Sequence, residues 1–211
     1  MDTRLLAFTA AAALVVAVPG PSVVFTVGRA LAHGRRVALA TVAGNALGIV
    51  VQVLAVAAGL GPLVAGSATA FTVLKLGGAA YLVWLGIHAI RHRHEAGAAL
   101  AAAAGAGDRV GAVRALRDGA VVGLLNPKSV VFLVAFLPQF VDPAGGVAAQ
   151  IVLLGAVFVL VALVLDSVWA LGAGAARDRL ARSPRRLAAV GAAGGVTMIG
   201  LGVGVAASRA A

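Results

Sequence analysis

The sequence lacks cysteine and is poor in charge. With no cysteine in 211 residues, a small secreted scaffold held by disulfides is excluded, and no thiol is present for nucleophilic catalysis. Only 11% of the residues are charged, whereas an average soluble domain carries roughly 25%. So few charges cannot cover a water-exposed surface, and the 62% hydrophobic content excludes a disordered chain. We therefore expect an integral membrane protein.

Acidic residues are the scarcer charged class, with seven against 17 lysines and arginines, which gives a formal charge of +10. Such an excess of positive charge would also suit a nucleic-acid-binding protein. The positions of the basic residues decide against that partner, because nearly all of them flank long apolar stretches. The expected partner of this chain is therefore the lipid bilayer and not a nucleic acid.

Six apolar stretches have the length of about 20 residues that a helix needs to cross the hydrocarbon core. They are Leu5–Gly28, Val37–Ala58, Ala70–Ile90, Gly119–Val141, Val147–Gly172 and Leu187–Ser208. Barrel strands would alternate apolar and polar residues, whereas these stretches are apolar on all sides. We expect an all-α integral membrane fold with six transmembrane helices. Cleavage of the first stretch as a signal peptide would leave five, but its apolar run is longer than a typical signal-peptide core.

Arginines gather in the first, third and fifth connections between these stretches. The thirteen arginines concerned are Arg29, Arg35, Arg36, Arg91, Arg93, Arg109, Arg114, Arg117, Arg177, Arg179, Arg182, Arg185 and Arg186. Only Arg4 and Arg209 fall on the opposite side. Because positively charged loops stay in the cytoplasm, these connections are predicted to be cytoplasmic and both termini to lie outside.

The two halves of the chain share a short motif. Ser-Val-Val-Phe occurs at Ser22–Phe25 and again at Ser129–Phe132, 107 residues later, and both copies follow a proline. Residues 1–90 and 119–211 are accordingly predicted to be two three-helix repeats joined by a basic loop at 91–118. Three spans is an odd number, so the second repeat enters from the other face, as in many secondary transporters. The alternative is a chance match between unrelated helices of biased composition.

Prolines interrupt the first and the fourth span, at Pro19-Gly20-Pro21 and at Asn126-Pro127. A proline removes a backbone hydrogen bond and clashes with the preceding turn, so both helices are predicted to break or kink. Irregular backbone at membrane depth is tolerated only where protein or a water-filled cavity satisfies it. Each half-helix that starts at a break points its positive N-terminal end inward, where it attracts carboxylates. These five residues are therefore predicted to bind the carboxylate of a small zwitterion, with a simple packing kink as the alternative.

Three formal charges lie within the spans, namely Lys75, Lys128 and Asp166, and the chain has no other lysine. Charges inside the membrane usually face a cavity or a partner. Lys128 is expected either to bind a substrate carboxylate or to hold the broken segment by bonding freed carbonyls. Asp166 is expected to pair with Lys128, to hold a substrate ammonium, or to carry a proton. Lys75 lies near the end of its span, where snorkelling to the interface competes with a place in the permeation path.

Asn45 and Gln52 lie seven residues apart on one face of the second span, beside Gly44 and Gly48. They are expected either to line the permeation path or to join helices through a groove of small residues. The sixth span carries a comparable row of glycines, Gly191, Gly195, Gly200 and Gly204. This row permits close packing within one chain or between chains, so a homo-oligomer is compatible with the sequence.

Signatures of enzymes are missing from the sequence. No histidine–carboxylate constellation lies in a span, and no GxxxxGK[ST] loop is present for ATP hydrolysis. The third connection begins with His92-Arg93-His94-Glu95, residue types that also occur in metal sites. A solvated basic loop is the simpler interpretation. We therefore expect a protein that is not an enzyme and has no cofactor and no metal site.

The sequence resembles the LysE/RhtB group of bacterial amino-acid exporters over nearly its whole length. The matching stretches are Pro19-Gly20-Pro21, Gly44–Gln52, Phe71–Leu82, Gly123–Lys128, Phe136–Val141 and the position of Asp166. The Asn-Pro-Lys and Leu-Pro-Gln-Phe motifs are the specific part, whereas Pro-Gly-Pro alone is weak. Gln52 departs from the family pattern, in which histidine is frequent there, so no role is carried over to it.

This resemblance implies a secondary transporter of the bacterial inner membrane that exports amino acids or their derivatives and is driven by the proton gradient. Two other functions compete with it. A divalent-cation exporter would need several carboxylates or histidines in the membrane, and the spans hold only Asp166. A non-transporting membrane scaffold would leave the buried charges without a role.

Overall fold

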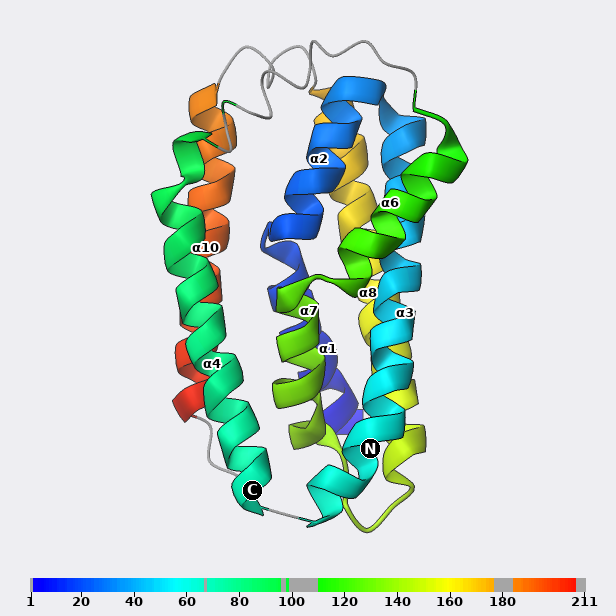
Figure 1. Cartoon of the computed structure of the whole chain (residues 1–211), viewed down its shortest axis with the longest axis vertical. Coiled ribbons are helices and arrows are strands. Elements are labelled where there is room, and N and C mark those ends of the chain that lie inside the picture. The colour runs from blue at the N-terminus through cyan, green and yellow to red at the C-terminus, as the bar shows by residue number, and fades with distance from the viewer. Residues whose placement is uncertain (1, 67, 96–97, 99–109, 177–183, 208–211) are drawn as a thin grey trace.

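The computed structural model describes residues 2–66, 68–95, 98, 110–176 and 184–207, and all regular structure in these ranges is helical (Figure 1). The α-helices are α1 (Asp2–Ala17), α2 (Pro21–His33), α3 (Arg35–Gly66), α4 (Ala68–Arg91), α6 (Ala112–Leu124), α7 (Pro127–Val131), α8 (Val147–Ala175) and α10 (Pro184–Ala207). A π-helical segment η1 (Phe132–Phe136) and a 3-10 segment η2 (Leu137–Phe140) follow α7. The expectation of an all-α protein is confirmed for these residues.

Among the described residues, two of the predicted spans are long and apolar enough to cross a membrane, or four if each bent helix pair counts as one span. Two are single helices, Arg35–Gly59 in α3 and Val147–Ala175 in α8. Two more are bent pairs, α1 with α2 and α6 with α7–η2. The remaining predicted spans coincide with α4 and α10, helices of 24 residues each, which are not among these four within the described residues. The number of six spans thus stays a prediction.

Successive passes run in opposite directions along the molecule (Figure 1). The beginning of α1 and the end of α10 lie at one end, and the turn between α2 and α3 lies at the other. The described arginines of the predicted cytoplasmic connections belong to this second end, here called the basic end. They are Arg29, Arg35, Arg36, Arg91, Arg93, Arg114, Arg117, Arg185 and Arg186. Arg109, Arg177, Arg179, Arg182 and Arg209 lie outside the described residues.

Both predicted breaks are present. The axis turns by 52° between α1 and α2, and by 43° between α6 and the segment that begins at Pro127. Pro21 and Pro127 each occupy the first turn of the new half-helix. A proline is well tolerated there, because the amide of that position has no partner within the helix.

The fourth span has a second distortion, after α7, which was not among the predicted breaks. After α7 the backbone widens into η1 and then tightens into η2, which contains Pro138. Pro138 cannot donate to the carbonyl four residues earlier, and its ring crowds that turn. The regular helix of this span is therefore confined to α6 and to the short α7.

Glycines bring α3 and α6 into backbone contact. A Cβ at Gly48 would collide with Ala120 O and Leu124 N, and a Cβ at Gly123 would collide with Asn45 O. Gly44 and Gly119 meet the facing backbone in the same way. The groove of small residues predicted beside Asn45 is thus confirmed as a helix–helix contact, made by two glycines spaced four apart on each helix.

A second close contact joins α4 and α10, which lie side by side in Figure 1. Gly86 and Gly195 each approach the carbonyl oxygen of the other. Part of the glycine row of the sixth span is therefore used within the chain. A Cβ at Gly200 or Gly204 would meet no atom of the described residues within 4 Å, so contact between chains stays a prediction for that part of the row.

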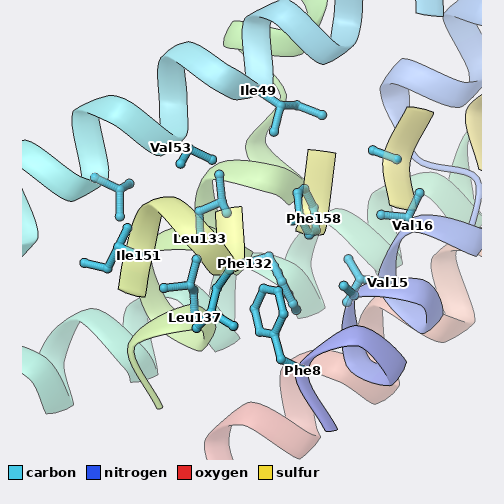
Figure 2. Packing of buried hydrophobic residues seen from close by; sticks show 14 of the residues in the cluster. Phe8, Val15, Val16, Ile49, Val53, Phe132, Leu133, Leu137, Ile151 and Phe158 are labelled. Carbon is cyan, nitrogen blue, oxygen red and sulfur yellow. The ribbon is translucent and has the colours of Figure 1, made fainter. Parts of the chain in front are cut away.

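Two apolar clusters flank a layer of polar residues. The larger cluster contains the buried phenylalanines Phe8, Phe132 and Phe158 and packs α1, η1, η2 and α8 against α3 (Figure 2). The smaller cluster joins α2, α3 and α8 through small side chains nearer the basic end. On the three passes that contribute to both clusters, α1–α2, α3 and α8, a buried polar residue lies between them along the chain. We call Ser22, Asn45, Asn126, Lys128 and Asp166, all buried, the polar layer.

Candidate functional site

Lys128 enters the polar layer from the first turn of α7 and bonds the end of α1. Its Nζ donates to Val15 O at 3.0 Å and to Val18 O at 2.7 Å. Val15 lies in the last turn of α1 and Val18 follows its end at Ala17. Pro19 has no N–H to donate to Val15 O, so Lys128 bonds carbonyls that the break leaves without a helical amide partner. A side chain at Gly20 would lie 3.1 Å from Nζ, so the glycine leaves room for this contact. Of the two roles predicted for Lys128, these contacts match the second, bonding carbonyls freed by the break.

Asn126 organises the second break. Its Oδ1 accepts from the backbone N–H of Lys128 at 3.1 Å, which makes it the N-cap of α7. Its Nδ2 donates to Ser22 Oγ in α2 at 3.0 Å, and Ser129 Oγ donates to its carbonyl at 3.0 Å. The two serines of the repeated Ser-Val-Val-Phe motif therefore meet at one asparagine.

The bond between Asn126 and Ser22 brings the N-terminal ends of α2 and α7 together. The N-cap of α2 is Gly20, which has no side chain to bond the first amides of that helix. Both helix ends carry partial positive charge, and the ammonium of Lys128 lies beside them. This side of the polar layer therefore suits an anionic group.

Asp166 supplies the negative charge of the layer. It lies in α8, is 3% exposed, and its Oδ2 accepts from Asn45 Nδ2 in α3 at 2.9 Å. Asn45 Oδ1 is buried and has no hydrogen-bond partner within the part of the chain that the structure describes. Asp166 and Lys128 interact electrostatically, but no ion pair within 4 Å joins them among the contacts of the described residues. The layer thus holds opposite charges that are separated.

Gln52 does not belong to the polar layer; its side chain bonds the end of α6, the first half of the broken fourth span. Its Nε2 donates to Gly123 O at 2.9 Å and to Leu124 O at 2.8 Å, the final carbonyls of α6. Its Oε1 is buried without a partner. Trp169 in α8 makes a similar contact with α1, since its Nε1 donates to Ala17 O at 3.3 Å. A side chain from a neighbouring helix therefore bonds the end of each interrupted half-helix.

The predicted site residues thus fall into three groups. The first comprises Pro19, Gly20, Pro21, Asn126, Pro127 and Lys128, which meet where the two breaks face each other. The second is the pair of Asn45 and Asp166, and the third is Gln52 alone. Lys75 lies in α4, and its side chain is outside the described part of the structure.

Ser22, Thr26 and Trp169 contribute to this region and were not predicted. Ser22 belongs to the repeated motif, so its place next to a break was visible in the sequence. Thr26 is 1% exposed, and its Oγ1 has no hydrogen-bond partner. Nothing in the sequence distinguishes it or Trp169 from other residues of an apolar helix.

The fold and the site define a helical membrane protein in which two broken helices meet at a buried layer of separated charges. The chain belongs to the LysE type translocator family, whose sequence profile matches residues 13–209. This membership agrees with the family resemblance seen in the proline breaks and the Asn-Pro-Lys motif.

Several relatives match most of the chain. It is 35% identical over 206 residues to an uncharacterized membrane protein of Vibrio cholerae, with 97% of both chains covered. It is 35% identical over 198 residues to the homoserine/homoserine lactone efflux protein of Salmonella typhimurium, with 90% of both covered. The leucine efflux protein of Klebsiella pneumoniae is 29% identical over 140 residues, which cover 65% of this chain and 63% of that protein. No solved structure matches the chain.

Proposed function

We propose that this protein is a secondary transporter that exports amino acids or small amino-acid derivatives across the bacterial inner membrane. The family membership and the efflux proteins for homoserine, its lactone and leucine support an amino-acid substrate. The observation that carries the proposal is the polar layer, in which two helix N-termini meet at the Asn126–Ser22 bond and Asp166, bonded to Asn45, supplies the negative charge.

A zwitterionic amino acid matches this distribution of charge. Its carboxylate would lie at the uncapped N-terminal end of α2, beside α7 and the ammonium of Lys128. Its ammonium would lie at Asp166 and at the unpartnered Oδ1 of Asn45. In the present conformation the cavity next to Lys128 has room for no more than about one water molecule. Binding therefore requires the helices around the layer to separate.

The proposed architecture is six spans arranged as two inverted repeats, residues 1–90 and 119–211, joined by the loop at 91–118. Equivalent contacts in the two halves support it, since α3 packs on α6 as α8 packs on α1. Gln52 and Trp169 also bond the equivalent ends of α6 and α1. The basic end would face the cytoplasm, and both termini would lie outside.

We place the coupling to the proton gradient at Asp166. It is the only carboxylate within the predicted spans, and its neighbour Asn45 can donate to the ionised carboxylate. A proton bound at Asp166 would remove the negative charge that holds the substrate ammonium. Binding of a proton and of an amino acid would then compete, which is the requirement for exchange of one against the other.

Export is tested by growth and by flux. Cells loaded with amino acid from dipeptides should be relieved of growth inhibition when they express the protein, and reconstituted protein should move labelled amino acid faster than empty liposomes do. Asp166→Asn should abolish relief and flux, whereas Glu95→Gln, the same change at an exposed position, should leave both unchanged. A broad panel of amino acids without flux would overturn the proposal. Flux of the same rate with and without an imposed pH gradient would overturn the proton coupling but not the export of amino acids.

A further inference from the structure

One stripe of α2 is polar from Ser22 to Arg29. Ser22, Thr26 and Arg29 are spaced four and three residues apart, so they follow one stripe of the helix. The two ends of this stripe bond the fourth span, since Ser22 Oγ accepts from Asn126 and Arg29 donates to Asp118. The stripe between them therefore faces α6, and we call this contact the α2–α6 seam.

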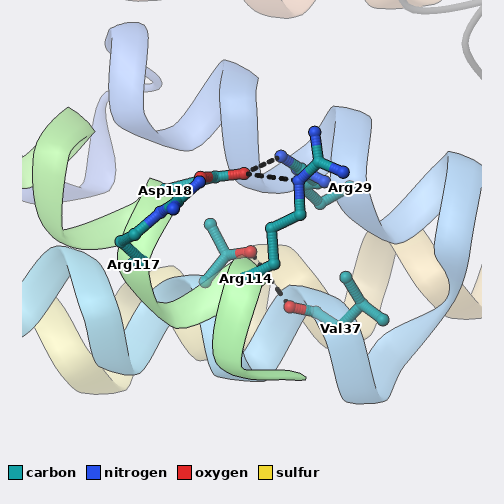
Figure 3. Close-up of polar contacts among 6 residues, drawn as sticks. Arg29, Val37, Arg114, Arg117 and Asp118 are labelled. Atoms are coloured by element: carbon teal, nitrogen blue, oxygen red, sulfur yellow. Dashed lines mark hydrogen bonds and ion pairs between the residues drawn. The ribbon is translucent and has the colours of Figure 1, made fainter. Parts of the chain in front are cut away.

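The end of the seam at the basic face is closed by an ion pair (Figure 3). Arg29 Nη2 lies 2.7 Å from Asp118 Oδ2, and the two side chains are only 16% and 23% exposed. Arg114 and Arg117 also approach Asp118, at 3.9 and 3.4 Å, but both belong to α6 itself. Arg29 is the one member of this group that comes from another helix, so it alone joins α2 to α6.

Thr26 marks the interior of the seam. Its hydroxyl oxygen is buried and lacks a hydrogen-bond partner among the described residues, although most buried polar side-chain atoms are paired. Water or a polar substrate would satisfy this hydroxyl if α2 and α6 separated. The α3–α6 contact also holds an unpartnered buried oxygen, Oε1 of Gln52, but there the two backbones meet at glycines and leave no space between the helices.

A related but looser pair lies at the opposite end of the molecule. Arg4 in α1 is 3.9 Å from Asp142, which follows η2, and the side chains are 62% and 53% exposed. Both pairs join the first broken span to the fourth. In the proposed repeat, α1 corresponds to α6 and α2 to the α7–η2 segment, so the two pairs occupy equivalent places with arginine and aspartate exchanged. The pair at the basic end is short and mostly buried. The pair at the other end is longer and exposed, and its two residues line a pocket together with Gln150.

We infer that the α2–α6 seam is the entrance through which the amino acid reaches the polar layer from the basic end. The Arg29–Asp118 pair closes this entrance in the present structure, and Thr26 lines it. The inference rests on the proposed export function, because an exporter must open toward the side from which it takes its substrate.

The absence of cysteine permits a direct test with Thr26→Cys as the only thiol in the chain. In inside-out vesicles a membrane-impermeant maleimide should label this cysteine slowly, because the seam is closed most of the time. Arg29→Gln in the same background should raise the labelling rate about fivefold or more, as expected when one charge-assisted hydrogen bond is lost. Arg117→Gln removes another arginine from the same carboxylate but should leave the rate unchanged, since Arg117 does not join the two helices.

Thr41→Cys is the matched control for burial. Thr41 is also 1% exposed, but its hydroxyl bonds Val37 O within α3, so labelling there should be insensitive to Arg29→Gln. Deuterium exchange of α2 amides, faster in Arg29→Gln than in Arg117→Gln, gives a second measurement without any cysteine. Equal labelling in the two glutamine variants, or labelling only from the opposite face, would overturn the inference. Labelling needs no transport, so loss of export without loss of this pattern would count against the proposed function alone.

Discussion

Replacing Lys128 with methionine separates the two roles that a lysine beside a helix break can have. Methionine keeps the unbranched chain and removes the ammonium, so the contacts with Val15 O and Val18 O at 3.0 and 2.7 Å are lost. If Lys128 chiefly bonds the end of α1, the substitution destabilises the protein whether or not substrate is bound. If it chiefly binds the substrate carboxylate, the protein without substrate is unaffected.

The expected magnitude follows from the two bonds. Hydrogen bonds to charged groups contribute about 1.5–3 kcal/mol each in soluble proteins, and interhelical bonds in membranes average about 0.6 kcal/mol with a maximum near 1.7. Lys128 is 4% exposed, so removal of its buried charge also recovers part of the desolvation cost. We expect a net loss of about 2–4 kcal/mol, which lowers the ratio of folded to unfolded protein on the order of 100-fold.

Unfolding in mixed detergent–SDS micelles, followed by circular dichroism, measures this loss. The titration is run with and without a transported amino acid, and Lys75→Met is the chemical control because it makes the same change at the only other lysine. We expect the midpoint of Lys128→Met to fall in both conditions. A fall of equal size in Lys75→Met would mean that loss of a lysine charge, and not loss of the bonds to α1, causes the effect. An unchanged midpoint without substrate, together with loss of the substrate-induced shift, would refute the role in bonding α1.

Two further substitutions test the remaining helix contacts. Gln52→Leu removes the bonds to Gly123 O and Leu124 O and should destabilise the protein by about 1–3 kcal/mol in the same titration; full stability would mean that water replaces the amide at the end of α6. Gly48→Leu places a side chain against the backbone of α6 and should cost about 3 kcal/mol or more, whereas Gly59→Leu, where no neighbour lies within 4 Å, should be accepted. Similar yields of folded protein from the two leucine variants would contradict the close contact.

The breaks of the first and fourth spans were predictable because proline acts locally. Pro21 and Pro127 each begin a half-helix. Proline suits this position because it has no N–H to leave unpaired and its φ is fixed near the helical value. The glycine groove beside Asn45 was predictable for a similar reason, since spacing along one helix defines a face. Pro138 carries the same local signal for a distortion, but a proline alone does not predict the π-helical segment η1 that precedes it.

The partners of the buried polar residues were not predictable, because they depend on how distant helices pack. The sequence left two kinds of acceptor open for Lys128, a substrate carboxylate or carbonyls freed by the break. Only the position of α1 shows that its ammonium reaches Val15 O and Val18 O. Gln52 shares a helix face with Asn45, yet it bonds α6 while Asn45 bonds Asp166. Seven residues along a helix move a side chain by about 10 Å, which is enough to reach a different neighbour.

The glycine contacts also have a mechanical consequence. Helices that touch backbone to backbone over several turns can neither slide nor tilt without collision, so α3 with α6 and α4 with α10 should each move as a rigid unit. The helix α2 is joined to α6 by the Arg29–Asp118 ion pair and to α3 and α8 by the side chains of the smaller apolar cluster, and it begins at Pro21, directly after Gly20. If the molecule opens at the basic end, we therefore expect α2 to rotate about Gly20, next to the polar layer. The α3–α6 and α4–α10 pairs would keep their internal contacts during this motion.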